Sequence, residues 1–312
     1  MRVVILCRDE TLHGVRRITE ESRRRRHRVR VLDPYRFLLK ADGGGIGLEF
    51  KGKPFTGGDV FMARLGAGIS EHSLALVRHL GASGALVINP AGSLEAARDK
   101  LRSVQLLVRN GLPTPRTAFA PDPSYLPRAL EAVGGPPVVM KLPRSTQGQG
   151  VMLAGSPEEA QSIADAMWAI ERDVIVQEFV GEAKGSDLRV MVIGGEAIGA
   201  VRRRAPKGDF RSNLHRGGSA RRARLTRRAA DLAERAAGVC GLDIAGVDLL
   251  ETKSGPLVLE VNAAPGFEGF ERAGERVVAA RIVDYLEERW LAHRAAGRRS
   301  PGREAGSTEP LL

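Results

Sequence analysis

Hydrophobic residues form two strand-length runs between residues 244 and 266, and a short polar turn that contains glycine separates them. Runs of this length around such a turn predict a β-hairpin. Successive side chains of a strand point to opposite faces. Folding back about the turn therefore brings Asp248 opposite the neighbourhood of Glu260, to within a residue of register, and places Asn262 on the face of Glu260. The hairpin gathers two carboxylates and an amide.

Carboxylate and amide oxygens suit a hard cation such as Mg²⁺ or Mn²⁺, which keeps some waters and usually shares the phosphates of a nucleotide. A soft metal has no ligands in this segment. The alternative is that Asp248 and Glu260 are ordinary outward-facing strand residues, and the hairpin alone is equally compatible with it. Other segments of the chain are needed to distinguish a metal site from ordinary strand residues.

The first part of the chain alternates strand-length apolar runs with helix-length segments. An arginine-rich segment ends near Arg26, and its last four residues are expected to be a solvated helix end, with anion binding as the alternative. Strands are predicted over residues 2–7, 29–32, 59–65 and 85–89. Because this alternation is typical of an α/β unit, we assign residues 1–92 to a small N-terminal α/β domain.

A second unit is predicted over residues 93–180, and it opens on a helix. Ser93 is positioned as the N-cap, and an Asn-Gly pair closes the segment. Lys100 lies at the edge of the apolar stripe of this helix, where it either reaches a neighbouring cleft or is a surface lysine. The stripe consists of Ala97, Leu101, Val104 and Val108.

Residues 138–153 read as a strand, a glycine-containing loop and another strand. A phosphate-binding Walker loop or a dinucleotide fingerprint needs a helix after its glycines, so neither fits here. Residues 147–150 are better interpreted as a lid whose backbone amides fold over phosphates. Lys141 stands among apolar residues of the first strand, where a cation needs an anionic partner. That partner is a phosphate ligand or, alternatively, a nearby carboxylate.

A third unit is predicted over residues 181–292. It begins with two strands that meet at a Gly-Gly turn. A loop at residues 205–218 follows and is dense in anion-binding donors, with a disordered surface loop as the alternative. Thr226 is expected to start a helix, the hairpin follows, and a helix from residue 275 to about Trp290 closes the unit. Residues 293–312, rich in Arg, Gly, Ser and Pro, are expected to be a disordered basic tail.

Composition narrows the class of protein. The chain has 312 residues, of which 43% are hydrophobic, so a large core is within reach. Nothing approaches a membrane span or a signal peptide, which predicts a cytoplasmic protein with no membrane partner. Two cysteines far apart in the sequence, Cys7 and Cys240, fit buried thiols better than a disulfide framework.

The formal net charge is +11, which favours anionic partners. Nucleic acid is one candidate, but the arginine clusters lack the interleaved aromatic residues that stack on bases. A nucleotide together with an acidic substrate explains the charge equally well.

Five stretches of the chain, in order and spacing, resemble the RimK family of ATP-grasp ligases. They are ARDKLRSVQLLVRNGLP, VVMKLPRSTQGQGV, VQEFV, GSDLRVMVIGGEAIGAVRRRAPKGDFRSNLHRGG and AGVDLLETKSGPLVLEVNAAPG. The resemblance covers nearly the whole chain. The sequence departs from the family pattern in two places. Pro143-Arg144 stands before the lid where relatives have acidic residues or glycine, and the basic tail is the second departure.

The resemblance implies an α/β, Rossmann-like pre-ATP-grasp domain followed by two α+β lobes that hold ATP between antiparallel sheets. The implied roles are carried over residue by residue onto this sequence. ATP-binding residues are Lys100, Lys141, Glu178, Phe179, Asp187, Arg211, Ser212 and Asn213, with Glu178 and Phe179 at the adenine and Asp187 at the ribose. Ligands of two Mg²⁺ or Mn²⁺ ions are Asp248, Glu260 and Asn262. The catalytic residues are Arg211 and Arg203, with Arg202 as the alternative to Arg203.

The family chemistry makes an acyl phosphate from a carboxylate and the γ-phosphate of ATP, and an amine then displaces phosphate. The resemblance implies addition of L-glutamate to the C-terminal tail of small-subunit ribosomal protein six, the ability to make poly-α-glutamate, and a homo-oligomer, expected to be a tetramer. The main alternative is a sibling ligase that adds glutamate or another amino acid to a carrier protein or small cofactor. A third hypothesis, a non-catalytic protein that binds the ribosome or nucleic acid, is based on charge alone. The sequence does not decide whether the tail binds RNA.

Overall fold

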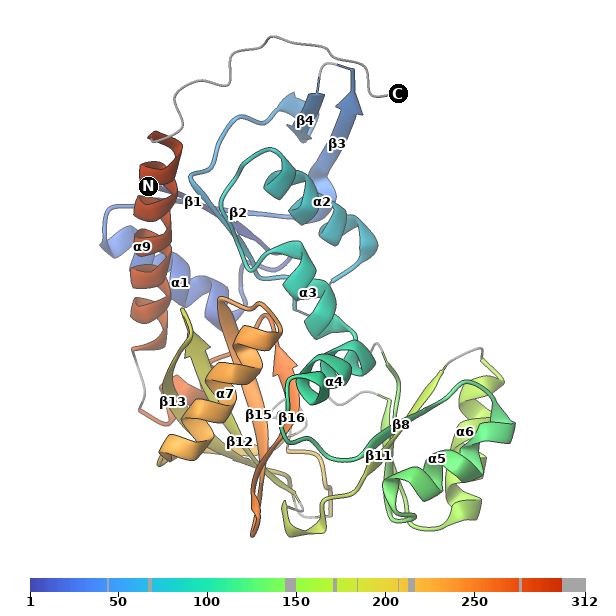
Figure 1. Ribbon diagram of the computed structural model, residues 1–312. Coiled ribbons are helices and arrows are strands. Elements are labelled where there is room, and N and C mark those ends of the chain that lie inside the picture. Colours follow the sequence, from blue (N-terminus) through green and yellow to red (C-terminus); the bar gives the residue numbers. More distant parts are fainter. Residues whose placement is uncertain are drawn as a thin grey trace.

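The computed structural model describes residues 1–43, 45–66, 69–143, 150–170, 173–183, 185–206, 208–212, 217–274 and 277–298 (Figure 1). Of the residues predicted for the site, Asn213 lies outside these ranges, and so do three residues of the predicted lid, 147–149. No helix in the described part of the chain is long and apolar enough to cross a membrane.

A four-stranded sheet in the order β2-β1-β6-β7 forms the centre of the N-terminal domain, and all its pairs are parallel. Alternate residues of β1 are buried on opposite faces, with Val4 and Leu6 packed towards α2 and Val3 and Ile5 towards α1 and α9. The predicted α/β unit is therefore confirmed. The elements are β1 (Arg2–Leu6), α1 (His13–Arg24), β2 (Arg28–Leu32), β6 (Val60–Ala63), α2 (Glu71–Ala82) and β7 (Val87–Ile88).

The segment after β2 contains a small antiparallel sheet, which the pattern of apolar runs does not predict. A short 3-10 turn, η1 (Pro34–Arg36), leads into β3 (Phe37–Asp42), which pairs with β4 (Gly45–Phe50), and β4 pairs with β5 (Lys53–Pro54). Phe37 packs against the rings of Phe50 and Phe55 and ties this sheet to the domain.

The prediction of a single helix after Ser93 was wrong. Two helices occur instead, α3 (Ala91–Arg98) and α4 (Lys100–Arg109), and Asp99 between them has an extended backbone. Its carboxylate accepts a hydrogen bond from the Arg102 N–H at 3.0 Å and so caps α4, which Ser93 does not. The break rotates α4, so that Leu107 is buried and Val108 is exposed.

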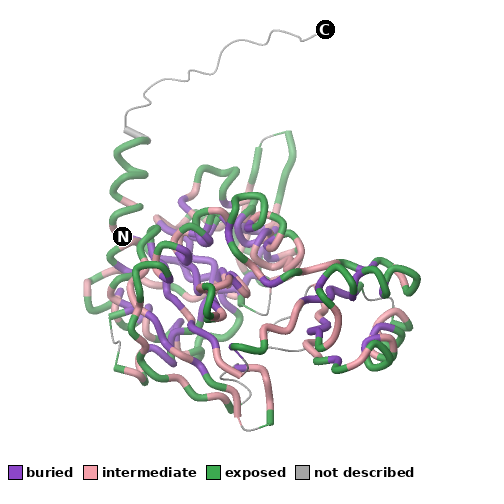
Figure 2. The backbone as a smooth tube through the Cα atoms, turned by 60° about the horizontal axis from the view of Figure 1, so that its bottom comes forward, coloured by how far each residue is buried: buried purple, intermediate pink, exposed green. Residues whose placement is uncertain are grey.

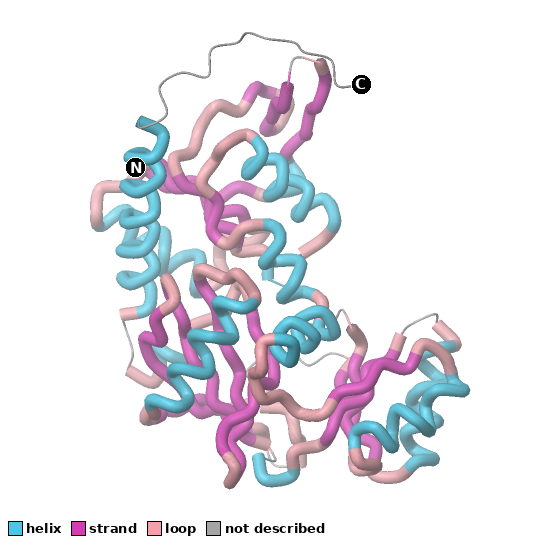
Figure 3. Tube along the Cα trace, viewed as in Figure 1, coloured by secondary structure: helices cyan, strands magenta, loops and turns pink. Residues whose placement is uncertain are grey.

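The central lobe is an antiparallel sheet in the order β10-β9-β11-β8, with two helices over one face (Figure 3). These helices and the sheet enclose a separate hydrophobic core that includes Met140, Ala160 and Val176. The elements are β8 (Thr117–Ala120), η3 (Pro123–Tyr125), α5 (Leu126–Val133), β9 (Val138–Lys141), β10 (Val151–Ala154), α6 (Pro157–Trp168) and β11 (Val174–Glu178).

The C-terminal lobe is a five-stranded antiparallel sheet in the order β14-β13-β12-β15-β16. The helix capped by Thr226 covers one face, and Cys240 is buried beside it as a free thiol, as is Cys7 in the N-terminal domain. The elements are η4 (Gly181–Ala183), β12 (Ser186–Ile193), β13 (Glu196–Arg204), β14 (Ser219–Ala223), α7 (Arg227–Val239), β15 (Ile244–Thr252), β16 (Gly255–Asn262), α8 (Glu268–Arg272) and α9 (Val278–Arg298).

Two hydrophobic clusters each contain residues of both the N-terminal domain and the C-terminal lobe, for example Leu6 with Val190, and Ile5 with Met191. These two parts therefore pack as one body, and the central lobe projects from it (Figures 1 and 2). The central and C-terminal lobes thus face each other across the point where the central lobe joins.

Helix α9 contradicts two predictions, one about the C-terminal tail and one about the end of the arginine-rich helix. It continues to Arg298, so residues 293–298 are helical and were wrongly assigned to the disordered tail. It also binds the end of the arginine-rich helix, because Arg25 pairs with Glu287 at 3.1 Å and with Asp284. Arg25 is therefore an interhelical ion-pair partner and not part of a solvated helix end. Residues 299–312 lie outside the described ranges.

Candidate active site

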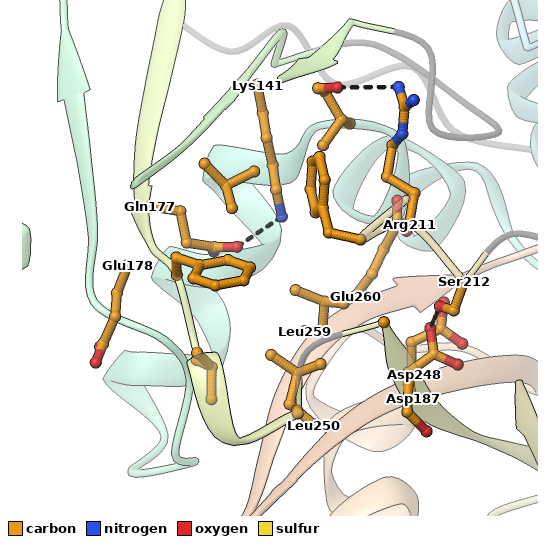
Figure 4. Close-up of a pocket in the computed structure, with 18 of the residues that line it drawn as sticks. Lys141, Gln177, Glu178, Asp187, Arg211, Ser212, Asp248, Leu250, Leu259 and Glu260 are labelled. Atoms are coloured by element: carbon orange, nitrogen blue, oxygen red, sulfur yellow. Dashed lines mark hydrogen bonds between the residues drawn. The ribbon is translucent and has the colours of Figure 1, made fainter. Parts of the chain in front are cut away.

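A cavity lies between the sheets of the central and C-terminal lobes, and Figure 4 shows the side chains that line it. Strands β9 and β11 supply one wall, and β12, β13, β15 and β16 supply the other. The structure brings ten of the predicted site residues together here: Lys100, Lys141, Glu178, Phe179, Asp187, Arg203, Arg211, Ser212, Asp248 and Glu260. Asn262 lines an adjoining groove, which shares Lys100, Arg203 and Glu260 with the cavity.

Lys141 ends β9 and points into the cavity (Figure 4). Its ammonium donates a hydrogen bond to Gln177 Oε1 at 2.6 Å, and Gln177 in turn donates to Thr117. No carboxylate of the described residues forms a salt bridge with Lys141. Desolvation lowers the pKa of Lys141 to about 8, although Glu260 opposes the shift. The cation is only partly compensated, which suits an incoming anion such as a phosphate.

Five charged side chains lie on one face of the C-terminal sheet because their positions are paired across the strands. Arg203 of β13 is opposite Asp187 of β12, and Arg189 of β12 is opposite Asp248 of β15. Asp248 is also opposite Glu260 of β16. Asp187 and Arg189 share this face through the two-residue period of the strand. The predicted hairpin and its register are thereby confirmed.

The charges on this face alternate and are bonded to one another. Arg189 binds Asp248 through two hydrogen bonds of 2.6 Å, and Arg203 binds Asp187 at 2.7 and 2.6 Å and Asp248 at 2.9 Å. Burial acts to raise the pKa of Asp248, but Arg189 and Arg203 hold it below its usual range. Arg203 has an exposed fraction of 4% and is therefore a buried cation that two carboxylates compensate.

The predicted donor set for a divalent cation consists of two carboxylates and one amide at neighbouring positions of β15 and β16. Asn262 Nδ2 lies 3.3 Å from Asp248 Oδ2, and Glu260 Oε1 lies 3.7 Å from Lys100 Nζ. No group of three His, Cys, Asp or Glu side chains suited to a metal occurs in the described part of the chain. The oxygens fit Mg²⁺ or Mn²⁺. Asp248, whose oxygens already accept from arginines, would share them with the ion.

The predicted adenine side is formed by the end of β11. The Glu178 side chain points away from the cavity (Figure 4) and binds Arg116 at 3.0 Å, which lowers the pKa of Glu178. The ring of Phe179 lies edge-on to that of Phe210, with centroids 6.3 Å apart, and both rings line the cavity. The two rings offer a hydrophobic surface to a flat base here, and the carboxylate of Glu178 is not directed towards it.

Arg211 and Ser212 close the cavity from the loop after β13. Arg211 is oriented by Asp209, at 2.9 Å, and donates to the Val151 carbonyl of the central lobe at 3.2 Å. Ser212 donates to Asp187 (Figure 4). Arg211 thus bridges the two lobes next to Lys141. Asp187 already accepts hydrogen bonds from Arg203 and Ser212, so a ribose hydroxyl would bind it in addition to these groups.

Sequence reasoning missed Gln177, Arg189 and Phe210. Gln177 was detectable as a polar residue inside an otherwise apolar strand, next to the predicted Glu178. Arg189 follows Asp187 by the strand period and therefore had to share its face. Nothing in the local pattern distinguishes Phe210 as part of the cavity.

Comparison with known families matches the chain almost from end to end. Residues 1–94 match the RimK pre-ATP-grasp domain, and residues 97–286 match the RimK-like ATP-grasp domain. The fold and site therefore define an ATP-grasp ligase, an enzyme that uses ATP to join an acid to an amine. The chain belongs to the RimK family of these ligases.

Curated relatives include two proteins named probable alpha-L-glutamate ligase. One, from Thioalkalivibrio sulfidiphilus, is 44% identical and the match covers 96% of this chain and 99% of the relative. The other, from Stenotrophomonas maltophilia, is 41% identical over 92% of this chain and 99% of the relative.

Solved structures agree in fold. A RimK domain ATP-grasp protein from Sphaerobacter thermophilus has a TM-score of 0.70 and 23% identity, covering 92% of this chain and 100% of that chain. The ligase PsnB, complexed with a precursor variant, Mg and ADP, has a TM-score of 0.70 and 22% identity, covering 93% and 98%.

Proposed function

We propose that the chain is an α-L-glutamate ligase that adds glutamate to the C-terminal carboxylate of small-subunit ribosomal protein six, by way of an acyl phosphate and with release of ADP and phosphate. One observation carries the reaction type. Lys141, Arg203 and Arg211 converge in one cavity with the carboxylates of Asp248 and Glu260. The relatives named as glutamate ligases support the donor.

Phosphoryl transfer to a carboxylate requires charge neutralisation and positioning more than a protein nucleophile. Lys141 and Arg211 both line the cavity, where they can neutralise phosphate oxygens. Arg203 is held rigidly by two carboxylates and offers a fixed cation to the acyl phosphate. The alternative, Arg202, is bonded to Glu251 on the half-exposed part of the sheet, so Arg203 is the better candidate.

The divalent cation would be held by Glu260, Asn262 and Asp248, where it would screen the phosphates and polarise the transferred group. Lys100, at the first position of α4, lies beside Glu260 and adds a cation on the same side. We predict two such ions, either Mg²⁺ or Mn²⁺. A homo-oligomeric state and a cytoplasmic location are predictions as well.

A sibling ligase with another acceptor is the alternative. The ligase PsnB, which shares the fold, has been solved in complex with the precursor peptide PsnA2 and AMPPNP. The test is ADP release by the purified protein with ATP, magnesium, L-glutamate and a peptide that carries the C-terminal sequence of the ribosomal protein. We expect release that requires glutamate, that the peptide increases and that Glu260→Gln abolishes. Release with glutamate and a different acceptor would overturn the proposed acceptor, and no release with any acceptor would overturn the proposed reaction.

A further inference from the structure

Arg64 is a buried cation that the proposed chemistry does not use. It follows β6 in the N-terminal domain and has an exposed fraction of 8%. One guanidinium nitrogen, Nη2, donates to the Pro265 carbonyl at 2.9 Å. The other, Nη1, is buried and has no hydrogen-bond partner in the described structure. Desolvation lowers the pKa of Arg64 to about 10, so the group stays charged near neutral pH.

Two carboxylates that line the same groove as Arg64 are bonded to other groups. Asp9 accepts hydrogen bonds from the backbone and side chain of Thr11, and Glu268 pairs with Arg272. Among the described residues, Arg64 forms no salt bridge. A buried guanidinium that lacks a carboxylate costs stability unless something else satisfies it.

The N-terminus of α1 lies directly beside this guanidinium. A Cβ placed on Gly14, in the first turn of α1, would lie 3.0 Å from Arg64 Nη2, so glycine leaves the room that the guanidinium occupies. No side chain caps α1 at Leu12, and its first turn contains no acidic residue. The first N–H groups of a helix lack partners within the helix and attract anions. Two independent features thus favour negative charge at one place.

That place is the edge where the parallel strands of the N-terminal sheet end. Residues directly after β1, β2 and β6, namely Cys7, Asp33 and Arg64, line one large groove together with the start of α1. Ligands of open α/β sheets bind outside the carboxyl ends of the strands, where the strand order reverses. Here the order β2-β1-β6 reverses at β1.

The groove continues into the cavity proposed for ATP. Lys100, Arg203 and Glu260 line both spaces, and Asn262 lines the groove. A molecule in the groove can therefore present one end to the reacting phosphate while its other end reaches the N-terminal domain.

We propose that Arg64 and the N-terminus of α1 form a carboxylate-binding subsite for an amino acid or peptide substrate of the ligase. The carboxylate is one that does not react, and it belongs either to the incoming L-glutamate or to the glutamate at the end of the acceptor. The identity of the ligand rests on the proposed function, whereas its negative charge rests on the groove itself. Arg64 positions the substrate and takes no part in phosphoryl transfer.

The kinetic test compares the wild type with Arg64→Met and Arg64→Lys, and measures KM separately for ATP, L-glutamate and the acceptor peptide. Loss of a charge-assisted hydrogen bond raises the KM of the bound substrate roughly 10- to 100-fold in Arg64→Met, and less in Arg64→Lys. The KM for ATP stays within about twofold. The substrate whose KM rises identifies the source of the carboxylate. Unchanged KM values for both substrates, or an equal rise in the KM for ATP, would overturn the subsite.

Arg78→Met is the matched control, because Arg78 forms an ion pair with Glu95 on the surface of the same domain. This variant keeps every KM of the wild type. Arg64→Met removes an uncompensated buried cation, so we expect it to unfold at the same temperature as the wild type or higher, which separates lost binding from lost folding.

Calorimetric titration of the ATP-free protein keeps the subsite testable even if no ligase activity is found. L-glutamate and a peptide ending in glutamate are the probes. At least one of them binds the wild type and Arg78→Met and binds Arg64→Met at least tenfold more weakly. Equal binding to all three proteins, or binding of neither probe to the wild type, would refute the subsite without reference to turnover.

Discussion

Lys141 carries a charge that substrate binding needs and that burial disfavours. Its pKa is lowered from 10.5 to about 8 by desolvation, a difference of about 2.5 units. At about 1.4 kcal/mol per pKa unit, the charged form costs the folded protein at most roughly 3 to 4 kcal/mol. Lys141→Met removes that cost and keeps an apolar stem. It also loses the hydrogen bond to Gln177, which contributes about 1 kcal/mol. We therefore expect the variant to be ~1–2 kcal/mol more stable at pH 7.

The pH dependence of this difference has a definite sign. Between about pH 8 and pH 10.5 the unfolded chain keeps a proton on Lys141 that the folded protein has released. The free energy of unfolding of the wild type therefore rises with pH across this window, relative to the methionine variant. Below pH 8 both states are protonated, and the full cost remains. The gap between the two proteins is largest near pH 7 and closes towards pH 10.5.

Urea unfolding at pH 7.0, 8.5 and 10.0 measures this gap, with Lys53→Met on the exposed strand β5 as control. The control should parallel the wild type at all three values. In the same preparations, kcat/KM for ATP should fall by at least about 100-fold in Lys141→Met and stay unchanged in the control. A Lys141→Met protein that is less stable than the wild type at pH 7, or a gap that is independent of pH, would refute the reasoning.

Three further substitutions test other parts of the site. Arg203→Met leaves the buried carboxylate of Asp187 without a cation and leaves Asp248 paired with Arg189 alone, so it should lower the free energy of unfolding by about 3–5 kcal/mol in urea titrations. A loss below about 1 kcal/mol would contradict the buried pairing. Glu178→Gln should change the KM for ATP by less than about threefold, because the side chain of Glu178 faces Arg116 and not the cavity. A tenfold rise in this KM would show that the carboxylate contacts the nucleotide. Glu260→Gln should abolish ADP release at an unchanged melting temperature, and residual metal-dependent turnover near that of the wild type would exclude Glu260 as a ligand.

The parts of the site that follow from local sequence rules were predictable. The hairpin that pairs Asp248 with Glu260 depends on a turn and on the two-residue strand period, and a register shift next to Asp248 sets the two residues directly opposite. Lys141 was recognisable because a cation interrupts an apolar strand. These features need no knowledge of distant segments.

The parts that depend on packing between distant segments were not predictable. The bonding of Arg189 and Arg203 to Asp248 requires β12 to lie between β13 and β15, an order that the sequence does not state. The break between α3 and α4 occurs because Asp99 caps the second helix, although a single periodic stripe runs through both. Similarly, Arg64 and Gly14 meet only because strand ends from the N-terminal sheet gather at one edge.

The central claim is the addition of glutamate to an acceptor carboxylate at the expense of ATP. Intact-mass spectrometry of small-subunit ribosomal protein six after incubation with the enzyme, ATP, magnesium and L-glutamate tests it most directly, with ADP measured in parallel. Our account predicts a ladder of glutamate-sized mass increments that accompanies ADP formation and is absent with Glu260→Gln. ADP without a ladder would contradict the proposed acceptor, and neither product with any acceptor would contradict the proposed ligase reaction itself.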